Sequence, residues 1–107
     1  MENSVKKAIE IIESKKGDNI KVYDVQGKSP FMDYVVVCDG SSSVKMEAIA
    51  TELKKEISTY KSMEGAGESQ WILIDFGDFI VNIFNGEKSE CYNIAELFQS
   101  SYVVFMR

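Results

Sequence analysis

Residues 71–84 read WILIDFGDFIVNIF, and this stretch is the part of the chain that decides the fold. Two runs of β-branched and aromatic residues lie on either side of Gly77, and such runs are typical of strands. A glycine between them allows the tight turn that joins two paired strands. We therefore predict a β-hairpin whose turn lies at residues 76–78.

The first strand of this hairpin divides its side chains into two sets, because successive residues of a strand point to opposite faces. The all-apolar set, which we expect to face the core, is Ile72, Ile74 and Phe76. The other set is Trp71, Leu73 and Asp75. An aromatic side chain with an apolar neighbour and a charge at the rim resembles the centre of a protein–protein interface. Packing of Trp71 beneath a C-terminal helix is the competing interpretation, since tryptophan is highly buried on average.

Hydrophobic periodicity outside the hairpin predicts three helices and two more strands. Helices are expected over residues 3–16, 43–60 and 92–98, and strands over 20–25 and 34–38 with a turn at 27–30 between them. Residues 61–70 contain two glycines and no periodicity, so we expect an exposed loop there. Residues 102–107 are mostly apolar and are left unassigned.

The predicted order of elements is α-β-β-α-β-β-α, and no repeat or linker interrupts it. A chain of 107 residues with 45% apolar and 27% charged residues has the size and composition of one globular domain. We therefore expect a single domain over residues 1–107 with an α/β fold. Its expected architecture is a mixed α+β sheet with flanking helices, partly open on the hairpin side.

The composition disfavours most catalytic functions. The sequence contains no histidine, which removes the commonest general base and the usual zinc ligand. Cys38 and Cys91 give neither a disulfide framework nor a metal-binding spacing, so we expect no metal and no cofactor. A net charge of −5 opposes docking on a phosphate backbone and favours a basic protein as the partner. The apolar runs are too short to cross a bilayer and no signal peptide is visible, so we expect a soluble, cytoplasmic protein.

Gly40 and the three serines that follow it lie where a strand is expected to lead into a helix. Backbone N–H groups at such a junction can bind an anion, although helix capping by serine explains these residues more simply. Nucleotidyltransferases combine such a turn with two carboxylates that hold metal ions. A metal-dependent enzyme that uses Gly40, Ser41, Asp75 and Asp78 with magnesium is therefore the alternative function. We nevertheless expect no enzyme, because a spacing of three residues across a glycine turn does not obviously put both carboxylates on one strand face.

The sequence resembles the Iojap family of bacterial and organellar ribosomal silencing factors over nearly its whole length. A tryptophan-led strand that runs into Asp-aromatic-Gly-Asp and then into a second strand is a specific pattern. The residues that carry the resemblance are Asp33–Val37, Gly40–Ser42, Ala48–Ala50, Trp71–Phe84, Tyr92 and Ile94–Phe98. The sequence departs from the family pattern at Lys45, Asn82, Ser89, Ala95 and Phe98, where the family usually has Gln, His, Arg, Glu and Trp. These departures concern the interface chemistry and not the fold.

The resemblance implies a fold related to nucleotidyltransferases but without their activity. It also implies binding to the fourteenth protein of the large ribosomal subunit, so that docking blocks joining of the small subunit and represses translation. By motif position, Trp71 would be the anchor, Asp75 and Asp78 would accept hydrogen bonds from Lys or Arg, and Tyr92 and Phe98 would be supporting aromatics. Leu73 completes this predicted site as the apolar neighbour of Trp71. Family members are often dimers, and the sequence leaves open whether this protein is a homodimer.

Overall fold

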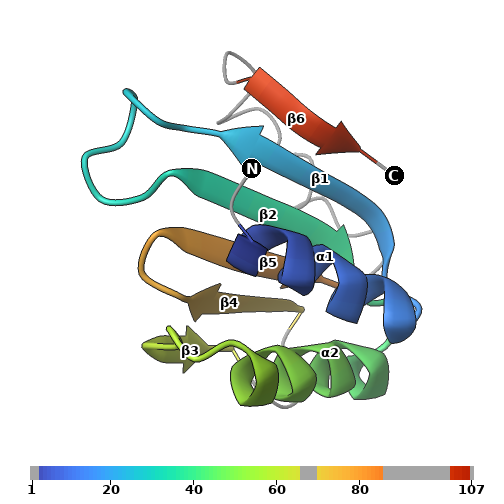
Figure 1. Ribbon diagram of the computed structural model, residues 1–107. Helices are drawn as coiled ribbons and strands as arrows, with labels where there is room; N and C mark the ends of the chain where they lie inside the picture. The colour runs from blue at the N-terminus through green and yellow to red at the C-terminus, as the bar shows by residue number, and fades with distance from the viewer. Residues whose placement is uncertain (1–2, 66–69, 86–101, 107) are drawn as a thin grey trace.

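Six strands form one mixed sheet, and two helices cover one of its faces in the computed structural model of the protein (Figure 1). The structure describes residues 3–65, 70–85 and 102–106. The helices are α1 (Asn3–Ser14) and α2 (Ser43–Glu56). The strands are β1 (Asp18–Asp24), β2 (Tyr34–Asp39), β3 (Ser62–Glu64), β4 (Trp71–Asp75), β5 (Phe79–Phe84) and β6 (Tyr102–Met106).

The strands lie in the order β3-β4-β5-β2-β1-β6. The central pair, β2 and β5, is parallel, and every other neighbouring pair is antiparallel. A parallel pair needs a long crossover connection, and the chain between β2 and β5 supplies it with α2. All six residues of β2 are buried, as its continuous apolar sequence predicts for a strand covered on both faces. The expected mixed sheet with flanking helices is therefore confirmed.

The predicted hairpin is also confirmed. β4 and β5 pair antiparallel, from Trp71 opposite Phe84 to Asp75 opposite Ile80. The turn between them is closed by the Phe76 N–H, which donates to the Phe79 carbonyl at 3.0 Å. In this turn Gly77 has a φ of 91°, a conformation that glycine adopts freely and other residues do not.

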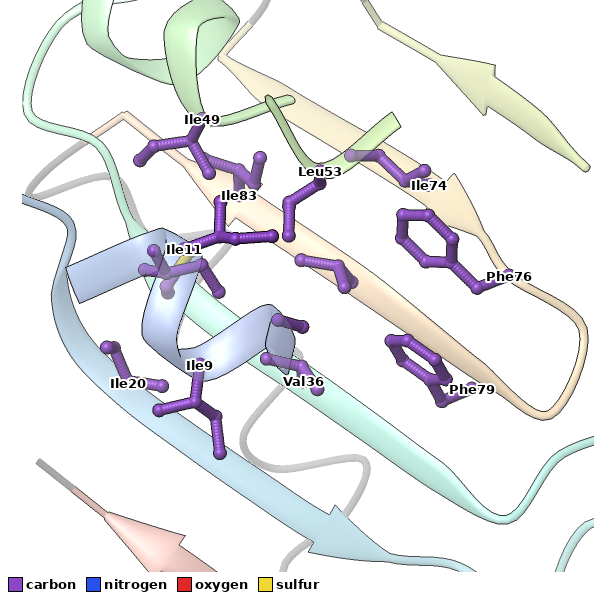
Figure 2. Close-up of a cluster of buried hydrophobic side chains, with 14 of the residues drawn as sticks. Ile9, Ile11, Ile20, Val36, Ile49, Leu53, Ile74, Phe76, Phe79 and Ile83 are labelled. Atoms are coloured by element: carbon purple, nitrogen blue, oxygen red, sulfur yellow. The ribbon is translucent and has the colours of Figure 1, made fainter. Parts of the chain in front are cut away.

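The core lies between the two helices and the sheet (Figure 2). Ile49 and Leu53 of α2 point toward the sheet, where they meet Ile83 of the central strand β5. The residues predicted to face the core, Ile72, Ile74 and Phe76, are each at most 1% exposed. The rings of Phe76 and Phe79 stack at the hairpin end of this core with centroids 5.0 Å apart. Burial of this apolar surface is the main stabilising contribution to the fold.

The helix α2 begins as predicted and ends earlier. Ser42 caps it, because its hydroxyl accepts a hydrogen bond from the Lys45 N–H at 3.1 Å, which supports the capping interpretation of the serine run. The predicted end at residue 60 is wrong, since Ile57 adopts an extended conformation. Ile57 is nevertheless buried in the core. The apolar pattern that predicts the helix therefore continues past the residue at which the helix ends. Similarly, α1 ends at Ser14 and not at residue 16.

Two strands are absent from the predicted order. The expected loop at residues 61–70 contains β3, whose three residues are too few for alternation to be visible in the sequence. The unassigned segment 102–107 contains β6, which pairs antiparallel with β1. This pairing joins segments far apart in the chain, and local sequence patterns do not encode it. The predicted helix over 92–98 lies outside the described residues.

Candidate functional site

The face of the sheet opposite the helices, here called the outer face, is built by β2, β5 and β4. Residues that are aligned across neighbouring strands share a face, so the observed register assigns its members. They are Val35, Val37 and Asp39 of β2, Ile80, Asn82 and Phe84 of β5, and Trp71, Leu73 and Asp75 of β4. The predicted division of the β4 side chains between two faces is thus confirmed.

Trp71 is held in a fixed orientation at one end of the outer face. Its indole N–H donates to Oδ1 of Asn82 at 3.0 Å, and its ring stacks on Phe84 with centroids 5.6 Å apart and an interplanar angle of 17°. The side chain remains 40% exposed. A large aromatic residue whose polar group is already satisfied and whose ring is partly open can bind a partner at low entropic cost.

Asn82 orients Trp71, and the sequence analysis identified it only as a departure from the family pattern. It is 1% exposed, and its Nδ2 donates to the Val36 carbonyl at 3.4 Å while its Oδ1 accepts from Trp71. One amide group therefore links three strands beneath the tryptophan. The signal that could have found it is a single polar residue inside the otherwise apolar run FIVNIF, because a buried polar side chain is retained only when it is hydrogen-bonded.

The two predicted carboxylates lie far from Trp71, which corrects the picture of a charge beside the aromatic ring. Asp75 shares the face of Trp71 but is four residues away along β4, a separation of about 13 Å at the usual strand rise. Its Oδ1 accepts a hydrogen bond from the Gly77 N–H at 2.8 Å, so this carboxylate also shapes the turn. Asp78 is exposed in the same turn. Of the predicted site residues that the structure describes, only Leu73 adjoins Trp71.

A shallow hollow of about 290 Å³ lies beside Trp71 and is lined by Glu64, Gly65, Trp71 and Leu73. Its walls are mainly apolar, with one carboxylate at the rim. Gly65 has a φ of 84°, and a side chain there would collide with the Trp71 carbonyl oxygen. The glycine thus permits the close approach of backbone that forms one side of the hollow.

The positions of the acidic residues do not fit the alternative function, a metal-dependent site made of Gly40, Ser41, Asp75 and Asp78. Gly40 follows the end of β2, whereas Asp78 adjoins its beginning, because the Asp78 carbonyl accepts a hydrogen bond from the Asp33 N–H at 2.6 Å. The six residues of β2 separate the two positions by about 20 Å. Residues that share a metal ion lie within a few ångströms of it, so Gly40 and Ser41 cannot act with Asp75 and Asp78. In the described ranges, no cluster of acidic or cysteine side chains is arranged to hold a metal ion.

Comparison with known proteins places this geometry in a family. The sequence matches the family described as "Ribosomal silencing factor during starvation", RsfS, over residues 1–105. This chain belongs to the ribosomal silencing factor family. It is 34% identical to the ribosomal silencing factor RsfS of Bacillus subtilis over 89 residues, which cover 79% of this chain and 75% of that protein. It is also 34% identical to the RsfS of Haemophilus influenzae over 93 residues, which cover 83% and 91% of the two chains.

A solved structure agrees with this family membership. The crystal structure of a protein from Chromobacterium violaceum superposes with a TM-score of 0.83 at 28% sequence identity, covering 92% of this chain and 88% of that one. The expected resemblance to ribosomal silencing factors is therefore confirmed for both sequence and fold.

Two predicted site residues of this family member, Tyr92 and Phe98, lie outside the described residues. Cys38 is a buried thiol in the core, as its place in an apolar run predicts. Within the part of the chain that the structure describes, no helix combines the length and the apolarity needed to span a bilayer.

Proposed function

We propose that this protein binds the large ribosomal subunit in the cytoplasm, through the fourteenth protein of that subunit, and blocks joining of the small subunit. Bound in this way it represses translation without a cofactor and without catalysing a reaction. The observation that carries the proposal is the half-exposed Trp71, which Asn82 and Phe84 hold ready on the outer face. Membership of the ribosomal silencing factor family supports the same function.

The electrostatics of the chain favour a basic protein surface within the ribosome. A net charge of −5 attracts a Lys/Arg-rich ribosomal protein and repels the surrounding RNA, which disfavours wrong orientations during docking. Steric blocking requires only that the bound protein occupies the space of the small subunit. It needs no catalytic site, so it is compatible with the distance between Gly40 and the carboxylates.

The hollow beside Trp71 suits a side chain of such a partner. A lysine or arginine could lay its apolar stem against Trp71 and Leu73 while its cationic head reaches Glu64 at the rim. This contact would combine cation–π attraction with burial of apolar surface. The carboxylate of Glu64 would also make the hollow selective for basic side chains, which an apolar hollow without a charge is not.

The direct test is co-sedimentation of the purified protein with isolated large and small ribosomal subunits, for the wild type and for Trp71→Ala. We expect the wild type to sediment with the large subunit alone and to reduce the fraction of joined ribosomes. Loss of a central aromatic anchor costs at least about 2 kcal/mol, so Trp71→Ala should bind roughly 30-fold more weakly.

Val44→Ala is the matched control, because Val44 is 80% exposed on α2 and lies away from the outer face. It should bind as the wild type does. Binding of the wild type to the small subunit, or binding to the large subunit without any effect on subunit joining, would contradict the proposed function. Unchanged binding of Trp71→Ala would contradict the site.

A further inference from the structure

The most exposed large apolar side chain among the described residues is that of Phe31, which is 82% exposed. It lies between β1 and β2, directly after Pro30. A side chain so open to water contributes little to the burial that stabilises the fold. The sequence analysis did not single it out, because an apolar residue inside a predicted turn has no periodicity to mark it.

The segment that presents Phe31 is ordered by hydrogen bonds. The Val25 N–H donates to the Asp33 carbonyl at 2.9 Å, and the Ser29 N–H donates back to the Val25 carbonyl at 3.0 Å. The Phe31 N–H itself donates to the Ser29 hydroxyl at 3.2 Å. The phenyl ring therefore projects from a braced turn, and a partner that binds it has little backbone entropy to remove.

Phe31 lies at the same end of the sheet as the acidic residues. The Asp33 N–H donates to the Asp78 carbonyl at 2.6 Å, so the turn that carries Phe31 adjoins the hairpin turn that carries Asp75 and Asp78. Asp78 is exposed, and Asp33 and Asp75 are half-buried. This end of the sheet therefore carries Phe31 and three carboxylates, with Lys61 beside Gly77 as a cation among them. The excess of negative charge around an aromatic side chain matches an apolar socket with lysines or arginines at its rim.

Apolar surface connects this end of the sheet with Trp71. Met32, the neighbour of Phe31, and Ile80 of β5 are half-buried and pack against the apolar cluster of the outer face. Leu73 continues the strip toward Trp71. Trp71 pairs with Phe84 at one end of the six-residue strand β5, and the turn that carries Phe31 adjoins Asp78 at the other end, so about 20 Å of strand separates the two ends of this surface. An interface of ordinary size buries about 800 Å² per partner, roughly 28 Å across, so one interface can include both.

We propose that Phe31 is a second anchor of the same docking surface, and that it inserts into an apolar socket bordered by Lys or Arg on the basic protein that Trp71 contacts. This inference rests on the proposed function. It extends the docking surface to the end of the sheet that carries Phe31, and it specifies that the partner has an apolar socket bordered by cationic side chains. Asp33, Asp75 and Asp78 contact the cationic rim of that socket. A nucleic acid is disfavoured as the occupant because its phosphates would meet these carboxylates.

The experiment measures affinity for isolated large ribosomal subunits with Phe31→Ala, Phe31→Leu, Trp71→Ala and Val44→Ala. Val44 is 80% exposed, so it controls for removal of an exposed apolar side chain elsewhere. We expect Phe31→Ala to bind roughly tenfold more weakly, Phe31→Leu to recover part of this loss, and Val44→Ala to bind like the wild type. Circular dichroism of each variant should match that of the wild type. If Phe31→Ala is misfolded, the affinity of Phe31→Leu relative to the wild type is the test: weaker binding supports the second anchor, and equal binding contradicts it.

Charge reversal at Asp78 tests the chemistry of the rim. Asp78→Lys should weaken binding, and the affinity of this variant should depend less on salt than that of the wild type, since fewer opposite charges are then paired. Wild-type affinity for Phe31→Ala with impaired Trp71→Ala would overturn the second anchor and leave the proposed function standing. Absence of wild-type binding to the large subunit would overturn both. Binding to deproteinised ribosomal RNA that is lost in Phe31→Ala would overturn the basic protein as the occupant.

Discussion

The two faces of the sheet differ in what they bury. The helix-covered face is apolar: side chains such as Ile74 of β4 pack together with Leu53 of α2, and both residues are fully buried. The buried polar or charged side chains of the described residues, Asn82 and Asp39, both lie on the outer face. Packing alone explains the first face. The second face also buries polar groups, which are costly to retain, and it is the face on which the proposed docking site lies.

Asp39 illustrates the difference further. The residue is 8% exposed, and Oδ2 accepts a hydrogen bond from Nδ2 of Asn19 at 2.7 Å, while Oδ1 has no hydrogen-bond partner among the described residues. A charge in such a position is costly to bury. The outer face therefore contains a buried carboxylate that lowers stability. Among the described residues, the helix-covered face buries no charged side chain.

The largest expected effect on stability comes from the helix-covered face. Leu53→Ala should reduce the free energy of unfolding by about 2–5 kcal/mol, because it leaves a cavity between α2 and the sheet. Urea denaturation measures this change. Affinity for the large subunit should be unaffected under conditions in which the variant is folded. A loss below about 1 kcal/mol would show that the helix and the sheet pack less tightly than the burial of Leu53 indicates.

An intermediate effect is expected at Asn82, where one substitution should change both the stability of the protein and its binding to the ribosome. Asn82→Ala leaves the Trp71 N–H and the Val36 carbonyl without their partner, so the free energy of unfolding should fall by about 1–3 kcal/mol. Trp71 is the only tryptophan in the sequence, so its fluorescence reports its environment directly. We expect the emission of Asn82→Ala to shift toward that of a solvated indole and ribosome binding to weaken.

Asn82→His provides the control for that experiment, because a neutral imidazole nitrogen can also accept a hydrogen bond from the indole. Its fluorescence should remain close to that of the wild type. Equal emission spectra for the wild type and Asn82→Ala would mean that Phe84 alone orients Trp71, and the amide would then be only a structural group.

The smallest effect is expected at Val44. This residue is 80% exposed on α2, and Val44→Ala should change the free energy of unfolding by less than about 0.5 kcal/mol. Thermal unfolding and large-subunit binding measure the two quantities. A clear loss of binding would mean that the helix-covered side also contacts a partner, and the contrast between the two faces would no longer hold.

Sequence alone predicts much of the fold because its main signals are local. Alternation along Trp71–Asp75 correctly assigns each side chain to a face, and the glycine turn correctly places the hairpin. The strand β3 escapes prediction since its three residues are too few to show alternation, and β6 escapes since pairing with β1, far away in the chain, creates it. The end of α2 is also not predictable from the sequence, because Ile57 packs into the same core as the helix residues although its backbone is extended.

The candidate site is predicted less completely than the fold. Strand phase puts Trp71 and Asp75 on one face, and their spacing of four residues, about 13 Å along a strand, already argues against a charge beside the aromatic ring. The hydrogen bond from Trp71 to Asn82 and the hydrogen bond from Asp33 to Asp78 both depend on sheet register. Register is a property of the assembled sheet, and hydrophobic pattern fixes it only where one face is buried and the other is polar.

The parallel pairing of β2 with β5 has a kinetic consequence. Tyr34 lies opposite Phe79, so the centre of the sheet joins residues 45 positions apart, whereas the pairs β1–β2 and β4–β5 can each form from nearby residues. Closing so long a loop is slow relative to forming either hairpin. The hydrogen bond from Asn82 to the Val36 carbonyl crosses this late junction. A nascent or partly unfolded chain would therefore lack the organised surface around Trp71, and competence to bind would arise only when the two halves of the sheet have joined.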